Sequence, residues 1–598
     1  MSQVPTDRPI LKWAVISMAC LFGLTALSQI KLQTWEQVRT LKLASDSKRF
    51  EFTSHDIARR GSILGSDDKP LAQDEKSFAL TVKFKKVPHS DAFFLELAQA
   101  TGIPASEFST LAAQDGQKTK SWLEPMPSDR YKAIMDLRKR WRADGISLAP
   151  TGQRTYPLGD AASCFVGVIK NYKEGTVHTG FERSMDASLT GKDGLRIGLT
   201  DRNGAFLPMR MDRASVLKRD GEDVVLTIDT DLQALASESI KSTVEENKAD
   251  YGVALAMDPK TGEILAMANW PSFDPNASTA SQGQFGFNPA YMAQLEPGSM
   301  FKILTLAKGL DEGAVNLNDS IYCSGEWHPT PTSIIHCDKH HGTRAHGQVS
   351  TLDAIARSCN VSAAIWATHV GRDNFIKFIR DLKVTYPTQL GLPGERRGNV
   401  DYADYAQKLQ LACWGFGQSI TCTPVGLLGG FGMIGNDGIR VEPRILRRVG
   451  SKIYKTEPGT QVVKPETAHT VMKCMEAVIQ SDEGTGAKLR IPGYRLAGKT
   501  GTAERVGKGE HGYVSNFVGF VPAQNPKALI LVMVSNPKGI KYYGADVAGP
   551  VFSQLAKAVI RHYNIPPTES ISTKIAAKPS KSTQEPSTKP FDKEAATP

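Results

Sequence analysis

The chain has 598 residues, of which 40% are hydrophobic and 22% are charged, and its formal net charge at pH 7 is +10. This length predicts two or more domains, and this composition predicts folded cores rather than general disorder. The positive charge is not gathered in an aromatic-rich basic stripe, which argues against a nucleic-acid partner and favours an anionic membrane surface or an anionic polymer.

The first element is the apolar stretch "ILKWAVISMACLFGLTALSQI" at 10–30. It has about the 20 residues that a helix needs to cross a bilayer. A cleaved signal peptide with Arg8 and Lys12 in its basic region is the alternative, but the cleavage pattern is weak and charged helical sequence follows at once. We therefore expect an uncleaved transmembrane helix at 13–30. The positive-inside rule then places residues 1–12 in the cytoplasm and the remainder outside.

Two folded domains are expected to follow. Residues 31–220 mix short strand and helix patterns, and we assign them to an elongated mixed α/β pedestal domain. A second domain, at 221–563, opens with a strand and a helix over 223–240. It continues at 251–270 with two alternating apolar runs around a Pro-Lys-Thr-Gly turn, the pattern of a β-hairpin. A mostly helical middle, three further strand candidates and a helix at 550–563 complete it.

This order predicts a multidomain α+β protein whose second domain has a central antiparallel sheet flanked by helices, because strands from both ends of the domain must meet in one layer. From 564 to 598 the chain is rich in Pro, Ser, Thr and Lys and has almost nothing apolar. We expect this tail to be disordered.

Ser299 and Lys302 form a Ser-x-x-Lys pair at the start of a predicted helix, in "EPGSMFKILTLAKGL". A serine hydroxyl needs a nearby base to become a nucleophile, and the spacing puts the lysine on the same helical face. The positive end of the helix dipole disfavours the charged amine and lowers its pKa. The pattern is weak by itself, because it recurs in the chain and because serine is a common helix cap.

Ser358, Cys359 and Asn360 head a second helical pattern, in "ARSCNVSAAIWATHV". Ser358 is placed to pass a proton between Lys302 and a leaving amine. Asn360 is placed to hold a substrate amide and the lysine. Cys359 we interpret as a small buried side chain behind the site.

Lys499, Thr500, Gly501 and Thr502 lie on a predicted strand, in "RLAGKTGTAE". Lys499 would depress the pKa of Lys302 further and attract a substrate carboxylate, to which Thr500 and Thr502 offer hydroxyls. Gly501 would let substrate lie against the strand, and the Thr502 backbone N–H would be the second oxyanion donor. A second Lys-Thr-Gly, at 260–262, falls in the expected hairpin turn and is assigned a structural role.

The order Ser-x-x-Lys, Ser-x-Asn, Lys-Thr-Gly resembles that of the penicillin-binding proteins and serine β-lactamases. The segments "RRGSIL", "GFERSMDASLTGKDG", "LTIDTDLQ", "MDPKTGEILAMANWPSFDPN" and "GFGQSITCTPVGLL" extend this resemblance to class B penicillin-binding proteins over the whole chain except the tail. The resemblance implies a β-lactamase-like transpeptidase domain without metal or other cofactor. It also implies that Ser299 attacks the D-Ala-D-Ala bond of a peptidoglycan stem peptide, and that β-lactams acylate the same serine.

Within class B, the segment at 516–555 resembles the septal, cell-division type, whereas the segment at 322–360 resembles the elongation type. We favour the septal type. It implies a bacterial inner-membrane protein at the division septum, which acts on lipid-linked nascent glycan beside a SEDS-family glycosyltransferase and divisome proteins. The alternatives are an elongation-type transpeptidase, a hydrolase, and a non-catalytic divisome scaffold or β-lactam receptor. Glu395 and Asn399 would suit a β-lactamase, but the residues between them do not match that pattern.

The segment at 323–346 is rich in possible metal ligands: Cys323, His336, Cys337, His340, His341 and His346. Thiolates and imidazoles bind zinc, but this spacing matches no zinc signature. We favour a Cys323–Cys337 disulfide in an exported loop over free thiols, and free thiols over zinc. One departure from the family pattern is also present, since Gly65-Ser66-Asp67-Asp68 stands where relatives have Asp-Arg. That difference concerns packing of the pedestal.

Overall fold

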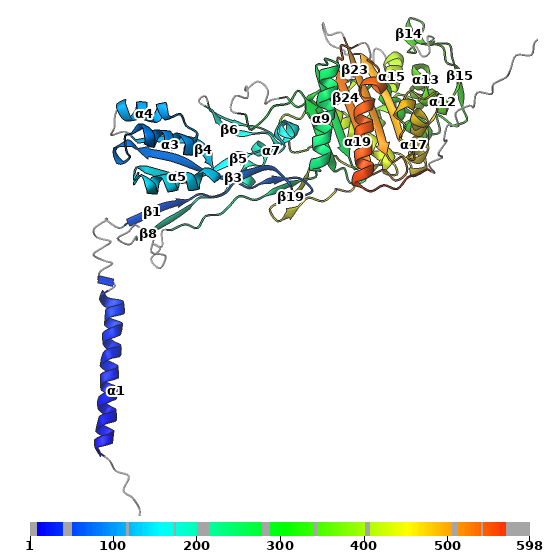
Figure 1. Cartoon of the computed structure of the whole chain (residues 1–598). Helices are drawn as coiled ribbons and strands as arrows, with labels where there is room; N and C mark the ends of the chain where they lie inside the picture. The colour runs from blue at the N-terminus through cyan, green and yellow to red at the C-terminus, as the bar shows by residue number, and fades with distance from the viewer. Residues whose placement is uncertain are drawn as a thin grey trace, which may run out of the picture.

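The computed structural model describes residues 9–36, 38–39, 51–114, 119–172, 175–199, 215–277, 287–338, 344–400, 407–504, 512–539 and 542–569 (Figure 1). The predicted disordered tail therefore lies almost entirely outside the described residues, as do the first eight residues and the histidines at 340 and 341.

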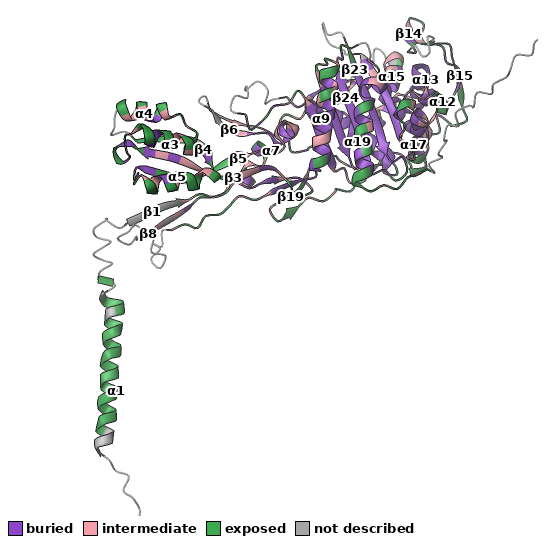
Figure 2. Ribbon diagram, in the orientation of Figure 1, coloured by how far each residue is buried: buried purple, intermediate pink, exposed green. Residues whose placement is uncertain are grey.

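The N-terminal helix α1 spans Pro9–Ile30 and continues as a π-helical segment, Lys31–Glu36. Among the described residues it is the one helix long and apolar enough to cross a membrane, over Trp13–Trp35 with a mean hydropathy of 1.7. Its described side chains are exposed, as Figure 2 shows, so none of the other residues that the structure describes covers its apolar surface. This is the arrangement that a lipid-facing helix requires.

The pedestal domain is built around one long strand, β3 (Pro70–Lys83), which pairs antiparallel with a strand on each side. Three amphipathic helices lie against these strands and bury a core that contains Phe84, Phe93, Phe108 and Ile134. The remaining elements here are β4 (Thr119–Pro127), β5 (Ile146–Thr155), α3 (Asp91–Thr101), α4 (Ala105–Gln114) and α5 (Asp129–Arg140). Smaller elements in this half of the chain are β1 (Glu51–Asp56), β6 (Ile169–Tyr172), β7 (Gly175–His178), α6 (Ser163–Val166), α7 (Gly180–Ser184), α8 (Asp186–Leu189) and β8 (Gly194–Leu199).

The pedestal sheet includes strands from the second half of the chain. The short strand β2 (Ile63–Leu64) pairs with β3 and, in parallel, with β9 (Val224–Leu226). β9 in turn pairs with β19 (Leu446–Val449), which pairs with β20 (Lys452–Ile453). A segment that follows the Ser-x-x-Lys and Ser-x-Asn motifs in the chain thus returns to the pedestal, and this shared sheet joins the two domains.

Buried charges explain why the segments "RRGSIL" and "GFERSMD" belong together. The Glu182 carboxylate is fully buried and accepts hydrogen bonds from Arg60 Nε at 2.9 Å and from Arg154 Nε at 2.6 Å. Arg60 also donates to Asp186 at 2.7 Å, and Arg154 donates to Asp74 at 3.1 Å. Each buried charge thereby has an opposite charge as its partner, which is the condition for its burial.

The departure at Gly65–Asp68 is accommodated by contacts with the second domain. Asp67 accepts a hydrogen bond from the Thr230 hydroxyl at 2.6 Å and lies 3.2 Å from Lys69. The Ser66 N–H donates to the Ile228 carbonyl at 2.7 Å. This turn therefore docks at the start of helix α9 (Thr230–Glu246).

The second domain contains a five-stranded antiparallel sheet in the order β11-β10-β24-β23-β22, as predicted from both ends of the domain. Alternate residues of its central strand face different cores: Leu529 and Leu531 belong to one cluster, Ile530 and Val532 to the other. A strand covered on both faces needs apolar residues throughout, which explains "KALILVMVS". The strands are β10 (Tyr251–Met257), β11 (Ile264–Trp270), β22 (Ala497–Glu504), β23 (Tyr513–Val521) and β24 (Ala528–Ser535).

Helices α9 and α19 (Gly549–His562) cover one face of this sheet, and the helical middle of the domain covers the other (Figures 1 and 2). The larger helices of the middle are α11 (Lys302–Asp311), α12 (Thr351–Ala356), α13 (Asn360–Val370), α14 (Arg372–Leu382), α15 (Gln407–Gly415), α16 (Pro424–Gly432) and α17 (Pro465–Gln480). The predicted α+β class, with a flanked antiparallel sheet, is confirmed. The predicted hairpin is β10–β11, and the predicted last helix is α19.

Candidate functional site

Ser299 lies on a 3₁₀ turn, Gly298–Met300, immediately before α11. The prediction that Ser299 and Lys302 share the first turn of one α-helix is therefore wrong in detail, because only Lys302 belongs to the α-helix. A 3₁₀ turn has three residues per turn, so positions three apart are eclipsed and the lysine still follows the serine on the same side.

The capping alternative for Ser299 is also wrong. The N-cap position of α11 is Phe301, which makes no side-chain cap hydrogen bond. The turn is held instead from behind, where the Gly298 N–H donates to the Gly417 carbonyl at 3.0 Å. Gly298 has a φ of 54°, and a Cβ there would come within 2.9 Å of the Ala503 side chain. Glycine thus allows the turn to lie directly against strand β22.

Ser358 lies between the two lysines of the site. Its hydroxyl oxygen is 3.1 Å from Lys302 Nζ and 2.9 Å from Lys499 Nζ. Lys302 Nζ also donates to the Ser358 carbonyl at 2.7 Å. Ser358 has a φ of 60°, a left-handed conformation that costs a non-glycine residue about 1–2 kcal/mol. This conformation presents both the hydroxyl and the carbonyl of one residue to the lysines.

Both lysines are fully buried, and burial sets their protonation. Burial lowers the pKa of Lys302 below its usual value. The pKa of Lys499 lies well below its usual range because of burial first and the charge of Lys302 second. A buried amine that is easily deprotonated is what a general base for a serine requires. The sequence analysis invoked the helix dipole for this effect, whereas desolvation is the main cause.

Strand β22 carries the Lys-Thr-Gly residues at the end of the sheet order, next to β23. The Thr500 hydroxyl lies 2.8 Å from that of Thr485, and Lys499 Nζ donates to the Thr500 carbonyl at 2.9 Å. The Thr502 hydroxyl accepts from the Gly544 N–H at 3.3 Å. Thr485, in the tight turns that follow α17, was missed by the sequence analysis because "EGTG" matches no catalytic pattern.

The structure explains why glycine occupies position 501, which the sequence alone did not reveal. A Cβ at this position would lie 1.7 Å from Oδ1 of Asn516, the residue that pairs with Gly501 on β23. The absent side chain therefore makes room for the Asn516 side chain.

Asn360 is the first residue of α13, and its side-chain Nδ2 donates to the His336 carbonyl at 2.8 Å. The structure thus attaches this amide to the loop that precedes it in the chain. The turn that carries Ser299 lies against β22, and Lys302 and Lys499 both contact Ser358. The three motifs therefore meet in one place, as their order predicted.

Two patterns that resemble catalytic motifs, the Lys-Thr-Gly at 260–262 and the pair Glu395 and Asn399, make contacts of another kind. Lys260 is in the turn between β10 and β11 and donates to Asn525 Oδ1 at 2.6 Å, which confirms the structural assignment of that Lys-Thr-Gly. Glu395 accepts a hydrogen bond from the Thr388 N–H at 2.6 Å within its own loop.

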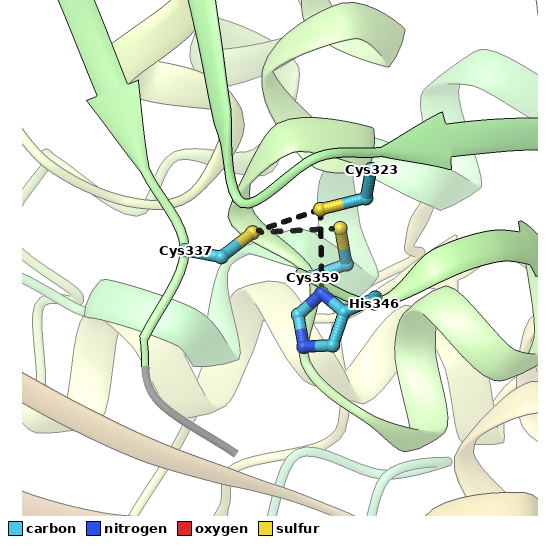
Figure 3. Close-up of side chains that lie close together, drawn as sticks. All are labelled: Cys323, Cys337, His346 and Cys359. Carbon is cyan, nitrogen blue, oxygen red and sulfur yellow. Dashed lines mark hydrogen bonds between the residues drawn. The ribbon is translucent and has the colours of Figure 1, made fainter. Parts of the chain in front are cut away.

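Three cysteines and a histidine meet directly behind the second motif (Figure 3). Cys323 ends β12 (Ser320–Cys323) and Cys337 follows β14 (Ser333–His336). His346 precedes β15 (Gly347–Ser350), and Cys359 is the N-cap of α13. All three thiols are free, so the disulfide favoured from the sequence is not present in the structure. The interpretation of Cys359 as buried is confirmed, but it belongs to a cluster that the sequence analysis did not assemble.

Comparison with known proteins identifies the family. Residues 252–557 match the model of the penicillin-binding protein transpeptidase domain, and residues 55–226 match that of the penicillin-binding protein dimerisation domain. The chain therefore belongs to the penicillin-binding protein transpeptidase family, and this pair of domains makes it a class B penicillin-binding protein.

Individual relatives with known names are similar to this chain over most of its length. It is 31% identical to the peptidoglycan D,D-transpeptidase FtsI of Buchnera aphidicola over 73% of this chain and 74% of that protein. It is 26% identical to the probable peptidoglycan D,D-transpeptidase PenA of Neisseria gonorrhoeae, over 96% of each chain. Among solved structures, penicillin-binding protein 3 of Mycobacterium tuberculosis in complex with aztreonam is 26% identical with a TM-score of 0.64, over 87% of this chain and 99% of that one.

Proposed function

We propose that this protein is a membrane-anchored D,D-transpeptidase that cross-links peptidoglycan stem peptides through an acyl-enzyme on Ser299, at the division septum. The observation that carries the catalytic part is that two buried lysines, Lys302 and Lys499, both contact the Ser358 hydroxyl. Lys302 follows Ser299 by one turn at the start of α11. The relatives named peptidoglycan D,D-transpeptidases support the same substrate.

In the first half-reaction Ser299 Oγ attacks the carbonyl carbon of the penultimate D-alanine, and the neutral amine of Lys302 takes the hydroxyl proton. The backbone N–H groups of Ser299 and Thr502 stabilise the oxyanion. The C–N bond then breaks, and D-alanine leaves with a proton that passes from Lys302 through the Ser358 hydroxyl. Lys302 and Ser358 are already hydrogen-bonded, so this transfer needs no large rearrangement.

In the second half-reaction an amine of a neighbouring stem peptide attacks the acyl carbon. It returns a proton along the same path, and Ser299 leaves with its hydroxyl restored. Lys499 Nζ and the Thr500 hydroxyl donate hydrogen bonds to the terminal carboxylate, whose negative charge opposes the lowering of the Lys499 pKa and favours its ammonium form. Asn360 positions the substrate amide. β-Lactams present a strained amide and a carboxylate to these groups and acylate Ser299 without a leaving D-alanine.

The membrane and septal parts rest on different observations. Helix α1 anchors the chain in the inner membrane, with the catalytic domain on the extracytoplasmic side. The septal assignment rests on the resemblance of the segment at 516–555 to the septal type; the described part of this segment includes most of β23, all of β24 and the start of α19. The septal type implies two kinds of partner for this protein, a SEDS-family polymerase and the divisome proteins. The elongation type is the second candidate, favoured by the cysteine-containing segment before Asn360.

The experiment is a cross-linking assay with the full chain in detergent or liposomes and uncross-linked glycan strands, supplied with a SEDS polymerase. Dimeric stem peptides from the wild type and none from folded Ser299→Ala are expected. Release of D-alanine without dimers would make the protein a hydrolase instead. A fluorescent fusion separates the two transpeptidase types, because mid-cell bands support the septal type and a dispersed lateral pattern supports the elongation type.

A further inference from the structure

Four side chains with the chemistry of zinc ligands converge at one point behind the second motif (Figure 3). They are Cys323, Cys337, His346 and Cys359, and one ligand atom from each lies within 4.8 Å of all the others. They come from four separate places in the chain: the last residue of β12, the residue after β14, the residue before β15, and the N-cap of α13. All four are buried, between 0% and 7% exposed.

The distances between these atoms fit a tetrahedral metal site. Zinc binds thiolate sulfur at about 2.3 Å and imidazole nitrogen at about 2.0–2.1 Å, so tetrahedral neighbours lie about 3.8 Å apart for two sulfurs and about 3.6 Å for sulfur and nitrogen. The sulfur of Cys337 is 3.6 Å from those of Cys323 and Cys359, and Cys323 Sγ is 3.5 Å from His346 Nδ1. A disulfide would need about 2.05 Å.

We propose that these four residues bind one structural zinc ion. Three thiolates and an imidazole are soft ligands that select zinc over magnesium or calcium. Four protein ligands complete a tetrahedron and leave no open position for water or substrate, so this zinc holds structure and performs no chemistry. This proposal differs from the expectation of a protein without a metal ion.

Backbone groups around the sulfurs support thiolate ligands. The Val361 N–H points at Cys337 Sγ at 3.5 Å, and the Ser362 N–H points at Cys359 Sγ at 3.4 Å. Such donors stabilise negative sulfur and orient it toward a metal. Both N–H groups belong to the first turn of α13, so the start of this helix is built around the two sulfurs.

The zinc would affect the reaction indirectly, by fixing the positions of the residues next to its ligands. Cys359 stands between Ser358, which contacts both lysines, and Asn360, whose amide is tied to the His336 carbonyl. A metal bond to Cys359 fixes the backbone that holds Ser358 in its left-handed conformation. The other ligands fasten the loop of β12, β14 and β15 to the same point. The four ligands are therefore positioning residues.

Metal content tests the proposal directly. The full chain, purified in detergent without chelator or added metal, is expected to contain one zinc per chain by mass spectrometry of the elements. Cys337→Ser is expected to lose it, while the equally buried Cys474→Ser on α17 keeps it. Denaturation with chelator and iodoacetamide should alkylate all three thiols. A Cys323–Cys337 disulfide, or equal trace metal in wild type and Cys337→Ser, would overturn the proposal.

Cobalt exchange covers the case in which Cys337→Ser does not fold. Wild-type protein loaded with Co²⁺ should show thiolate-to-cobalt charge-transfer bands and the intense visible bands of a tetrahedral site. Unchanged aqueous cobalt spectra would contradict the assignment as firmly as absent zinc. His346→Gln, which leaves every thiol in place, should weaken metal retention and alter the visible bands.

A final comparison separates this inference from the proposed function. Removing zinc should slow acylation of Ser299 by a fluorescent penicillin roughly tenfold to hundredfold, because a small displacement of a catalytic group has effects of that size. Ser299→Ala should abolish acylation and still bind one zinc. Zinc without acylation in the wild type would refute the transpeptidase proposal and leave the metal site intact. Full acylation speed in folded, zinc-free protein would refute the positioning role.

Discussion

The two domains bury charge in opposite ways. In the pedestal, Arg60 and Arg154 both donate to the buried carboxylate of Glu182. In the transpeptidase domain, Lys302 and Lys499 are as deeply buried, but their hydrogen bonds go to hydroxyl and carbonyl oxygens. Paired charges stay ionised and hold a fold together, whereas a buried amine among neutral acceptors is pushed toward its neutral form. The contrast distinguishes a structural cluster from a chemical one.

The largest expected effect is on the chemical side. Lys302→Met removes the base and should reduce the acylation rate by about 10²–10⁴. It should not lower stability greatly, since an apolar side chain replaces a desolvated amine. Stopped-flow labelling and thermal unfolding measure the two effects. Lys260→Met, in the other Lys-Thr-Gly, is the control and should change neither. An unaltered acylation rate in Lys302→Met would remove the lysine from the mechanism.

The pedestal should respond in the opposite sense. Glu182→Ala removes the carboxylate that two partly buried guanidinium groups share, although Arg60 keeps Asp186 and Arg154 keeps Asp74 as partners. The loss should cost about 1–3 kcal/mol of unfolding free energy. The acylation rate of the protein that remains folded should be unchanged. Glu238→Ala, on the exposed side of α9, should stay within about 0.5 kcal/mol of the wild type. Denaturant unfolding with the penicillin label as a second readout decides both points.

An effect of similar size is expected where β22, the last strand in the sheet order, pairs with β23. Gly501→Ala puts a Cβ against Asn516 Oδ1 and should cost about 1–3 kcal/mol through overpacking. The double variant Gly501→Ala with Asn516→Ala should recover part of this loss, because it removes the clashing oxygen. A double-mutant cycle with no coupling between the two positions would show that the glycine serves substrate rather than the neighbouring strand.

The mildest test is the pH dependence of acylation. The neutral amine of Lys302 is the active form, so the rate should be low at acidic pH and rise up to tenfold per unit until the pKa is passed. Burial lowers the pKa of Lys302, and the midpoint should therefore fall below the ordinary lysine value of about 10.4. Acylation rates measured over a pH series give the midpoint. A midpoint at or above the ordinary value would mean that burial does not activate this lysine.

Local sequence patterns were enough to predict many of the helices and strands of this protein. The apolar run at 528–535, the hairpin around 260 and the order of the three motifs depend on residues near one another in sequence, and their elements were predicted. The pairing of β9 with β19 was not, because no local pattern shows that two short strands far apart in the chain will meet. The place of Gly501 beside Asn516 depends on strand register and could be seen only in the folded sheet.

The cysteine cluster shows the same limit in the site. The sequence analysis considered the loop from 323 to 346 as a unit and placed Cys359 in a motif of its own. Cys359 was therefore not recognised as a fourth ligand, and the sequence analysis favoured a disulfide between Cys323 and Cys337. Only the folding of that loop onto the start of α13 brings motif and loop together.

The most direct test of the central claim is labelling of the purified chain with a fluorescent penicillin, followed by peptide mapping and a time course of label loss. We predict a stable adduct on Ser299 that is absent from folded Ser299→Ala. A folded wild-type protein without any adduct on Ser299, or with an adduct lost as fast as it forms, would contradict the account of Ser299 as the nucleophile of a transpeptidase.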